Sequence, residues 1–319
     1  MAEKILVLGA CGQVGTELVE NLQKIYGAAN VIASDIRTSD NPVFQNGNFE
    51  TLNVLDKAQI ANSFGKHKPT IVYHLAALLS ATAEANPKFG WELNMDGTFN
   101  IFDACLEYGV KRIFWPSSIA VFGPTTPALL TPQSTILEPN TIYGITKLAG
   151  ERYCEYYNAR YGLDVRSIRY PGLIGWKSLP GGGTTDYAVD IFHQALKTGS
   201  YTSFLNENTT LPMMHMEDAV RATLEITNAP IDKIKLRSSY NIAGTSFSPD
   251  ELATEIRKHI PEFTLEYAID SRQNIADSWP DSIDDSAARQ DWGWNEKYCL
   301  EKLVSNMLEN IESASTSTG

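Results

Sequence analysis

The sequence predicts an α/β protein: a doubly wound parallel sheet with helices on both faces, followed by a smaller α/β lobe. Apolar stretches of strand length alternate with segments of helical period from the first residues onward, as in βαβ units. The strand-like stretches are nearly continuous in apolar residues, as burial on both faces of a parallel sheet requires. After about residue 172 the alternation loosens, and glycine and proline become more frequent.

The first lobe begins with a strand, a helix and a second strand. Residues 4–10 (KILVLGA) predict the first strand, and residues 13–27 predict a helix whose C-terminal cap is Gly27. Residues 31–35 (VIASD) predict the second strand. The later elements of this lobe are expected as a strand over 70–78, a helix over 91–109, a strand over 112–118, a helix over 142–162 and a strand over 165–172.

The second lobe is expected to mix short strands with helices. Its strands are predicted in YTSFL, YNIAG and TLEYAI, and its helices in AVDIFHQALKTG, DELATEIRKHI and residues 299–312. We therefore divide the chain into a first domain over 1–172, to which 212–230 returns, and a second over 173–312. Residues 313–319 (SASTSTG) predict a disordered tail.

Composition excludes several classes of function. The net charge of −12 argues against a nucleic acid or another polyanion as partner. The four cysteines lie far apart, and neither they nor the five histidines show the spacing of a metal site, so we expect reduced thiols and no bound metal. An apolar strand follows Met1 almost at once, and no apolar stretch is long enough to span a bilayer. These features predict a soluble, cytoplasmic protein without a membrane anchor.

A glycine-rich turn predicts a dinucleotide site. Gly9, Gly12 and Gly15 stand in GACGQVG, between the first strand and the first helix, where glycine lets the backbone approach a pyrophosphate. Asp35 ends the next strand, where a carboxylate binds the adenosine ribose and repels a 2′-phosphate, which favours NAD over NADP. The alternative is a structural turn with a surface aspartate, and Arg37 leaves some tolerance of NADP possible.

Two further positions extend the expected cofactor contacts. Gln13 and Val14 lie inside the glycine turn, at the start of the helix that receives the pyrophosphate. Asp56, in NVLD, would suit the adenine edge, but a helix N-cap is an equally good interpretation of an aspartate there.

A tyrosine and a lysine four residues apart predict acid–base chemistry. Tyr143 and Lys147 share one face of the expected helix over 142–162. A nearby ammonium lowers the pKa of a phenol, which is otherwise near 10, toward the working range of a general base. Ser118 ends the preceding strand, where its hydroxyl can hold the substrate oxygen, and the adjacent Ser117 is the weaker candidate. The alternative is that Ser118 is only a hydrogen-bonded serine at a strand end.

These residues resemble the extended short-chain dehydrogenase/reductases over residues 5–294. Besides the glycine turn and the Tyr143–Lys147 pair, the resemblance lies in HLAA (74–77), PSSIAVFG (116–123), LNMDGT, RYPG and MHMEDAVRA. It implies a Rossmann domain that binds NAD, hydride transfer to nicotinamide C4, Tyr143 as base and Lys147 on the nicotinamide ribose. It also assigns cofactor contacts to Leu75, Ala76, Ala77 and Asn94.

Within this family, the substrate segments resemble the short-chain L-threonine 3-dehydrogenases. The resemblance rests on LLSA (78–81), PGGGTTDYA (180–188), LPMMHMED (211–218) and DSWP (277–280). It implies oxidation of the 3-hydroxyl of L-threonine, with glycine amides on the substrate carboxylate. The substrate contacts it implies are Ser80, Gly182, Thr185, Asp186 and Trp279, and either Thr184 or Asp186 has the alternative role of capping the following helix.

The sequence leaves two alternative functions open, and the resemblance also implies an oligomeric state. A nucleotide-sugar epimerase or dehydratase of the same family is the first alternative, although RYPG replaces the RYFN typical of such epimerases, and residues 172–215 offer few basic groups for a diphosphate. A non-catalytic NAD-binding protein is the second. The resemblance further implies a homodimer formed by the helices over 91–108 and 143–161, whose aromatic side chains could instead pack on the sheet.

Overall fold

The computed structural model describes residues 3–45, 47–181 and 183–317. Within them, six parallel strands form the central sheet in the order β3-β2-β1-β4-β5-β7. This order, with the crossover next to β1, is that of a doubly wound fold, and it confirms the predicted fold class. The strands are β1 (Ile5–Leu8), β2 (Val31–Asp35), β3 (Asn48–Thr51), β4 (Ile71–His74), β5 (Arg112–Phe114) and β7 (Asp164–Arg166).

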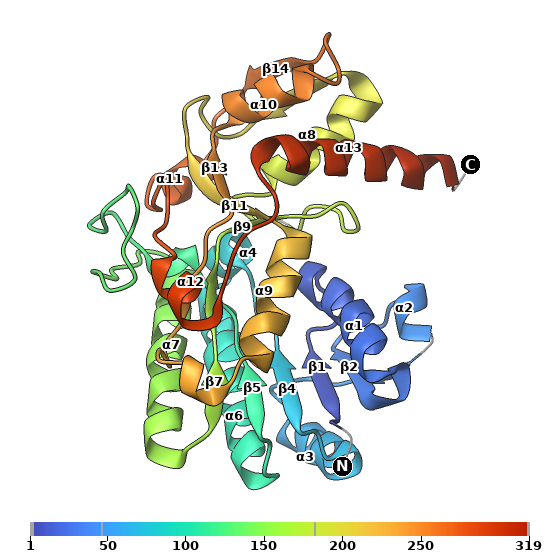
Figure 1. Ribbon diagram of the computed structural model, residues 1–319, viewed down its shortest axis with the longest axis vertical. Coiled ribbons are helices and arrows are strands. Elements are labelled where there is room, and N and C mark those ends of the chain that lie inside the picture. Colours follow the sequence, from blue (N-terminus) through green and yellow to red (C-terminus); the bar gives the residue numbers. More distant parts are fainter. Residues whose placement is uncertain (1–2, 46, 182, 318–319) are drawn as a thin grey trace.

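Helices cover both faces of this sheet (Figure 1). Ile5 and Val7 of β1 belong to one core with α1 and α9, and Leu6 and Leu8 belong to the opposite core with α3, α6 and α7. This alternation follows from the two-residue period of a strand, so both halves of the apolar run ILVL are buried. The helices are α1 (Gln13–Tyr26), α3 (Lys57–His67), α6 (Gly97–Glu107), α7 (Ile142–Tyr161) and α9 (Met216–Asn228).

Two predicted strands are each interrupted at a proline. The strand over 112–118 ends as β5 before Pro116, and the chain continues as β6 in another small sheet. The strand over 165–172 gives β7 and β8, and Pro171 separates β8 from β9. Proline has no N–H to donate to a strand ladder, which accounts for both interruptions. The remaining strands are β6 (Ser117–Ser118), β8 (Ile168–Tyr170), β9 (Gly172–Ile174), β10 (Ser200–Ser203), β11 (Leu211–His215), β12 (Tyr240–Asn241), β13 (Thr245–Phe247) and β14 (Thr264–Tyr267).

A second group of helices gathers at the other end of the molecule (Figure 1). Phe192 of α8, Leu252 of α10 and Leu303 of α13 share one buried core, to which Trp279 also belongs. α9 instead packs with α1 in a core of the central sheet. The domain boundaries stay a prediction. The helices concerned are α8 (Tyr187–Thr198), α10 (Pro249–Arg257), α11 (Arg272–Ala276) and α13 (Leu300–Ser317). The other helix of this part of the chain, α12 (Ser286–Trp292), packs through Ala288 in a core of the central sheet.

The helix expected over 91–109 is not regular. The chain forms α5 (Pro87–Trp91), then a π-helical segment (Glu92–Asp96), and then α6. A π-helical turn accommodates one additional residue in a helix and is frequent at functional sites. Asn94 lies inside this segment. The other short elements are α2 (Pro42–Gln45), α4 (Ser80–Ala85), and 3-10 helices at Ala28–Asn30, Ile119–Val121 and Ile231–Lys233.

The tail predicted to be disordered over 313–319 is helical through residue 317. α13 extends to Ser317, so the prediction is wrong for 313–317, whereas 318–319 lie outside the described residues. Extending a formed helix adds one hydrogen bond for each residue fixed, and this outweighs the weak propensity of serine and threonine.

Candidate active site

A cavity of about 510 Å³ is lined both by residues of the central sheet and its helices and by residues of the later segments that lead to the second group of helices. It lies beyond the carboxyl ends of the central strands, where ligands bind in open α/β sheets. Its wall includes most of the predicted site residues: Gly9, Gly12, Gln13, Val14, Gly15, Leu75, Ala77, Ser80, Ser117, Ser118, Tyr143, Lys147, Thr185, Asp186 and Trp279. Segments far apart in the sequence therefore form one site.

The glycine turn has the geometry expected of a phosphate-binding turn. Gly9 has φ +83°, and a Cβ there would lie 2.6 Å from the amide nitrogen of Ala76. A Cβ at Gly15 would lie 2.3 Å from the Gly9 carbonyl oxygen. Glycine is therefore required at both positions. Among the described residues no side chain caps α1 at Gly12, which leaves the first-turn N–H groups for an anionic ligand.

Asp35 supports the glycine turn from the end of β2. Its carboxylate, only 7% exposed, accepts hydrogen bonds from the N–H groups of Cys11 at 2.9 Å and Arg37 at 3.0 Å. The Arg37 guanidinium lies 3.5 Å from the same carboxylate and is largely exposed. Arg37 lines the cavity and Asp35 does not. A carboxylate and a guanidinium therefore stand together where the adenosine ribose is expected.

Besides Asp35, three predicted cofactor residues lie outside the cavity wall: Asp56, Ala76 and Asn94. The Asp56 carboxylate caps α3 by accepting from the N–H groups of Ala58 and Gln59, as the alternative interpretation proposed. The backbone of Ala76 packs against Gly9.

Asn94 acts behind the cavity. Its side chain accepts from the N–H of Leu78 at 2.7 Å and donates to the carbonyl of Leu78 at 3.1 Å. It also donates to the Thr146 hydroxyl at 3.2 Å. Asn94 thus ties the loop after β4 to α7, and in this structure it supports the cavity wall without forming part of it.

Tyr143 and Lys147 lie on one face of α7, as predicted. Burial raises the pKa of Tyr143 to about 12, and a hydrogen bond with Ser118 opposes this shift. Burial lowers the pKa of Lys147 to about 7, against the opposing effects of Cys154 and Glu151. The Lys147 ammonium donates to the Pro116 carbonyl at 2.6 Å and lies 5.6 Å from the centre of the Tyr143 ring. In this structure the interaction that lowers the Tyr143 pKa therefore comes from Ser118, where the sequence had predicted Lys147.

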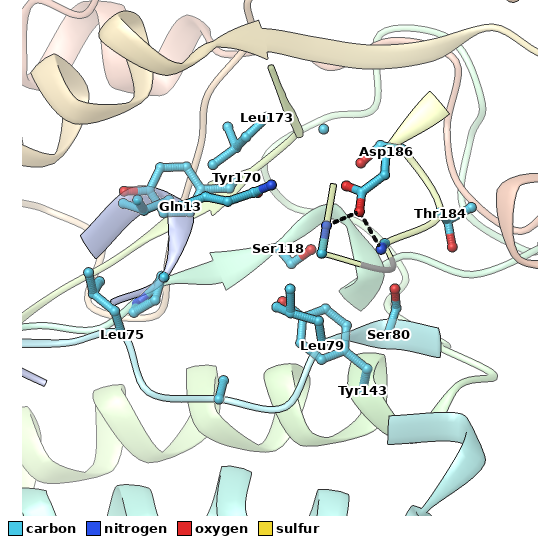
Figure 2. Close-up of a pocket in the computed structure, with 18 of the residues that line it drawn as sticks. Gln13, Leu75, Leu79, Ser80, Ser118, Tyr143, Tyr170, Leu173, Thr184 and Asp186 are labelled. Carbon is cyan, nitrogen blue, oxygen red and sulfur yellow. Dashed lines mark hydrogen bonds between the residues drawn. The ribbon is translucent and has the colours of Figure 1, made fainter. Parts of the chain in front are cut away.

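The two adjacent serines have different partners. The Ser117 hydroxyl donates to the Glu151 carboxylate at 2.6 Å, a buried contact that the sequence did not predict. The Ser118 oxygen accepts from the N–H of Ala120 at 3.2 Å, next to Tyr143. Figure 2 shows the side chains of Ser118, Tyr143 and Ser80 around the same space. Of the two serines, Ser118 has the hydroxyl suited to a substrate oxygen.

The glycine-rich loop before α8 is held by Asp186. One oxygen of its carboxylate accepts from the N–H groups of Gly181 at 2.7 Å and Gly183 at 2.8 Å (Figure 2). The sequence predicted that these amides reach a substrate carboxylate, but the two described here are already bonded to Asp186. A carboxylate five and three residues away reaches them because the loop folds back on itself. Gly182, also a predicted contact, lies outside the described residues.

Thr184 is a cavity residue that the sequence did not single out for substrate. Its side chain is 1% exposed and lines the cavity, and its hydroxyl oxygen has no hydrogen-bond partner among the described residues. A buried hydroxyl without a partner costs free energy, so a polar ligand here would be favourable. Its neighbour Thr185 was preferred in the prediction, and both line the cavity. The other lining residues not predicted are Cys11, Arg37, Leu79, Pro116, Ile119, Tyr170, Pro171, Gly172, Leu173, Ser178, Leu179, Pro180, Gly181 and Gly183.

Across residues 3–45, 47–181 and 183–317, no group of three or more His, Cys, Asp or Glu side chains is arranged to hold a metal ion. Within those ranges, no helix has the length and apolar character needed to cross a membrane.

The chain as a whole is similar to NAD dependent epimerases/dehydratases and to L-threonine dehydrogenases of known structure. A model of the NAD dependent epimerase/dehydratase family matches residues 5–243. An uncharacterized epimerase/dehydratase of Staphylococcus aureus (strain USA300) is 47% identical over 317 residues, 98% of each chain. The holo structure of a GalE-like L-threonine dehydrogenase from Cupriavidus necator is 53% identical, with TM-score 0.94 over 97% of this chain and 99% of that one. A monomeric L-threonine 3-dehydrogenase from a metagenome is 47% identical, with TM-score 0.94 over 97% and 99% of the two chains.

Proposed function

The chain belongs to the NAD dependent epimerase/dehydratase family, and we propose that within it the protein is an L-threonine 3-dehydrogenase. The reaction is oxidation of the 3-hydroxyl of L-threonine to 2-amino-3-oxobutanoate, with NAD⁺ as hydride acceptor. The resemblance to the extended short-chain dehydrogenase/reductases and the assignment of NAD as cofactor are confirmed.

One observation carries the choice of substrate. The likeness to an L-threonine dehydrogenase covers 97% of this chain and 99% of that one, at 53% identity. Binding loops are generally more variable than the elements they connect, so a likeness that leaves so little of either chain uncovered favours a shared substrate.

The cavity residues that come from the central sheet and its helices fit a dinucleotide. The uncapped first turn of α1 would hold the pyrophosphate, and Asp35 with Arg37 would hold the adenosine ribose. When bound, NAD⁺ supplies a cationic ring that accepts a hydride. Lys147, which lines the cavity beside Tyr143, would bind the nicotinamide ribose.

In the proposed reaction Tyr143 is the base and Ser118 orients the substrate. The Ser118 hydroxyl would hold the 3-oxygen of threonine next to Tyr143, whose phenolate would take the hydroxyl proton to become a phenol as the adjacent carbon gives up its hydride to the bound NAD⁺. The phenol pKa near 12 is too high for this role at neutral pH. The Lys147 ammonium, 5.6 Å from the centre of the Tyr143 ring, would stabilise the phenolate and lower that pKa.

The substrate end of the cavity suits a small amino acid. Ser80 comes from α4, Thr184 and Thr185 from the loop before α8, and Trp279 from the segment after α11. These are hydroxyls and an aromatic ring, with the Asp186 carboxylate nearby as a partner for an ammonium. Trp279 is buried in the second core, so it would define a fixed wall of the substrate pocket.

The test is formation of NADH. Purified protein is mixed with NAD⁺ and L-threonine, and absorbance at the NADH band is followed, with product analysis for 2-amino-3-oxobutanoate. The same protein is then given NAD⁺ and UDP-hexoses, with analysis of the sugar products. Threonine-dependent NADH without sugar conversion is expected. Epimerised or dehydrated sugar without threonine oxidation would replace the proposal by the alternative that the name of the Staphylococcus relative suggests.

We also propose that two chains associate through α6 and α7. Phe99 of α6 contacts Tyr153 of α7 with ring centres 4.1 Å apart, and Tyr156 and Tyr161 of α7 are each about half exposed. Large exposed aromatic side chains on adjacent helices are typical of protein interfaces. Light scattering of the purified protein, and of a Tyr156→Glu variant, tests this: a dimer converted to a monomer is expected, and a monomeric wild type, like the metagenome protein, would contradict it.

A further inference from the structure

One face of α7 contacts three successive residues of the strand segment that carries Ser118. Tyr143, Lys147 and Glu151 follow one another at four-residue spacing and therefore lie in line along the helix. Within residues 116–118, Lys147 binds the first through its carbonyl, Glu151 binds the second through its hydroxyl, and Tyr143 interacts with the third. The first two helix residues have assigned roles in the proposed reaction. Glu151 has none.

Glu151 is fully buried and saturated with hydrogen bonds. Its side chain is 0% exposed. One carboxylate oxygen accepts from the Ser117 hydroxyl at 2.6 Å and from Arg169 Nε at 2.8 Å, and the other accepts from an Arg169 Nη at 2.7 Å. A bidentate guanidinium–carboxylate pair fixes both the direction and the distance of its members. The carboxylate is consequently a rigid anchor for Ser117.

Arg169 is itself held in place. It lies on β8, directly opposite Ser117 in the strand pairing with β6. Its remaining Nη donates to the Asn241 side chain at 3.0 Å, and its guanidinium lies 5.3 Å from the centre of the Phe122 ring. A buried charged pair is costly unless all of its groups are paired, and here each is. The pair thus ties α7 to the strand bearing the serines.

We propose that Glu151 is a positioning residue for hydride transfer: through Ser117 and Arg169 it fixes the strand segment that presents Ser118 to the Tyr143 phenol. Because Ser117 and Ser118 are adjacent, holding the Ser117 hydroxyl on Glu151 also fixes the backbone from which the Ser118 side chain reaches Tyr143. One serine is then the anchor and the other remains for the substrate. The inference rests on the proposed function for the reaction itself.

The same carboxylate acts on Lys147. Burial is the largest influence on the Lys147 pKa and lowers it, whereas Cys154 and Glu151 on the same helix raise it. The other ionisable groups facing Lys147 are Tyr143, on its own helix, and the buried His74 at the end of β4. Glu151 is the carboxylate among these groups, and it favours the ammonium form that the proposed reaction uses.

The first experiment removes the anchor without removing a charge. Ser117→Ala deletes the hydrogen bond to Glu151. Ser167→Ala is the matched control, because Ser167 is equally buried and donates or accepts one bond, to Ser239 at 2.7 Å, away from α7. We expect Ser117→Ala to lower kcat about 10-fold with unchanged NAD⁺ affinity, since a hydrogen bond to a charged group is lost. It should also shift the ¹³Cζ resonance of Tyr143, assigned with Tyr143→Phe, in NAD-free protein.

The two readouts separate this inference from the substrate assignment. The Tyr143 resonance needs no threonine, so its displacement in Ser117→Ala, and not in Ser167→Ala, supports the anchor even if another alcohol is the substrate. An unmoved resonance, or a kcat within twofold of that of Ser167→Ala on whichever alcohol the wild type oxidises, overturns the inference. Absence of threonine oxidation by the wild type, with the resonance displaced, counts against the proposed function alone.

The second experiment removes the charge. Glu151→Gln alone leaves the buried Arg169 unpaired and can prevent folding, so it is made together with Arg169→Gln. We expect the double variant to lose activity at a lower pH than the wild type on the alkaline side of the pH profile, because Lys147 loses the carboxylate that favours its ammonium form. NMR titration of lysine ¹³Cε, with Lys147→Met for assignment, follows the same change in NAD-free protein. If the double variant loses activity at the same alkaline pH as the wild type, and if its Lys147 titrates at the same pH, Glu151 has only a structural role.

Discussion

The two sides of the cavity differ in how firmly their residues are held. On one side, Tyr143 and Lys147 belong to a 20-residue helix, and Lys147 is 4% exposed with its ammonium bonded to a carbonyl. On the other side, the loop over 178–186 includes Leu179, 72% exposed, and two of its glycine amides depend on the single carboxylate of Asp186. One side is fixed by a buried network and the other by a few local bonds.

This difference matches the demands of the proposed reaction. Proton and hydride transfer need groups placed within a few tenths of an ångström, which buried helices and strands provide. Substrate entry and release need a segment that opens at low cost, and loops with few buried contacts do so. We therefore expect substitutions on the α7 side to change kcat and substitutions on the loop side to change KM.

The largest effect is expected at Tyr143. Tyr143→Phe removes the proposed base while preserving the ring, so kcat for threonine should fall about 10³-fold, within the range that general base catalysis contributes. NAD⁺ affinity, measured by titration of protein fluorescence, should stay within twofold. Tyr161→Phe, at the exposed end of the same helix, is the control and should retain full activity. Near-normal turnover in Tyr143→Phe would show that Tyr143 is not the base and would favour the alternative of a non-catalytic NAD-binding protein.

The next effect tests the loop. Asp186→Ala releases the Gly181 and Gly183 amides, and we expect KM for threonine to rise about 30-fold with a smaller change in kcat, since each bond to a charged group contributes about 1.5–3 kcal/mol. Steady-state kinetics at saturating NAD⁺ measures both constants. Asp190→Asn, one turn further along α8, is the control. A fall in kcat without a rise in KM would contradict the expectation that substitutions on the loop side change KM and those on the α7 side change kcat.

A third substitution concerns only the cofactor. Asp35→Ser removes the charge that repels a 2′-phosphate and leaves the exposed Arg37 guanidinium, so the preference for NAD over NADP should narrow about 10-fold. The ratio of kcat/KM for the two cofactors measures this. Adding Arg37→Ala should restore part of the preference. Unchanged selectivity in Asp35→Ser would mean that the carboxylate only holds the glycine turn.

The smallest effect is expected at the loop threonines. Thr185→Ala should raise KM for threonine about 5-fold, as expected for one neutral hydrogen bond, and leave KM for NAD⁺ nearly constant. Thr184→Val, a replacement of similar shape, compares the neighbouring buried hydroxyl. Equal changes in both KM values after Thr185→Ala would place that residue outside the substrate pocket. A larger effect of Thr184→Val would move the substrate contact to Thr184.

Most of the fold could be predicted from the sequence, because strands buried on both faces consist almost entirely of apolar residues. β1, β2 and β4 and helices α1 and α7 were predicted from such runs and from caps such as Gly27. The prolines at 116 and 171 were visible, but the destination of the chain after each interruption was not, since it depends on which small sheet accepts the next strand. β3 was missed because its four residues, NFET, include a single apolar side chain and none of them is buried.

The site shows the same division. The glycine turn and the four-residue spacing of Tyr143 and Lys147 are local patterns with a direct physical meaning, and both line the cavity. The partner of Ser117 could not be read locally, because Glu151 and Arg169 lie 34 and 52 residues away. The hydrogen bonds from the Gly181 and Gly183 amides to Asp186 could not be predicted either, because they require the loop to fold back on itself.

The sequence by itself determined which groups this protein can bring to a reaction and which cofactor turn it carries, because helix period, glycine spacing and strand ends are properties of neighbouring residues. Only the tertiary structure decided which partners those groups have: which serine is bonded to Glu151 and which to Tyr143, and whether a glycine amide is already bonded to Asp186. The physical reason is that a hydrogen bond acts over about 3 Å in space. Two residues at that distance can be separated by any length of chain.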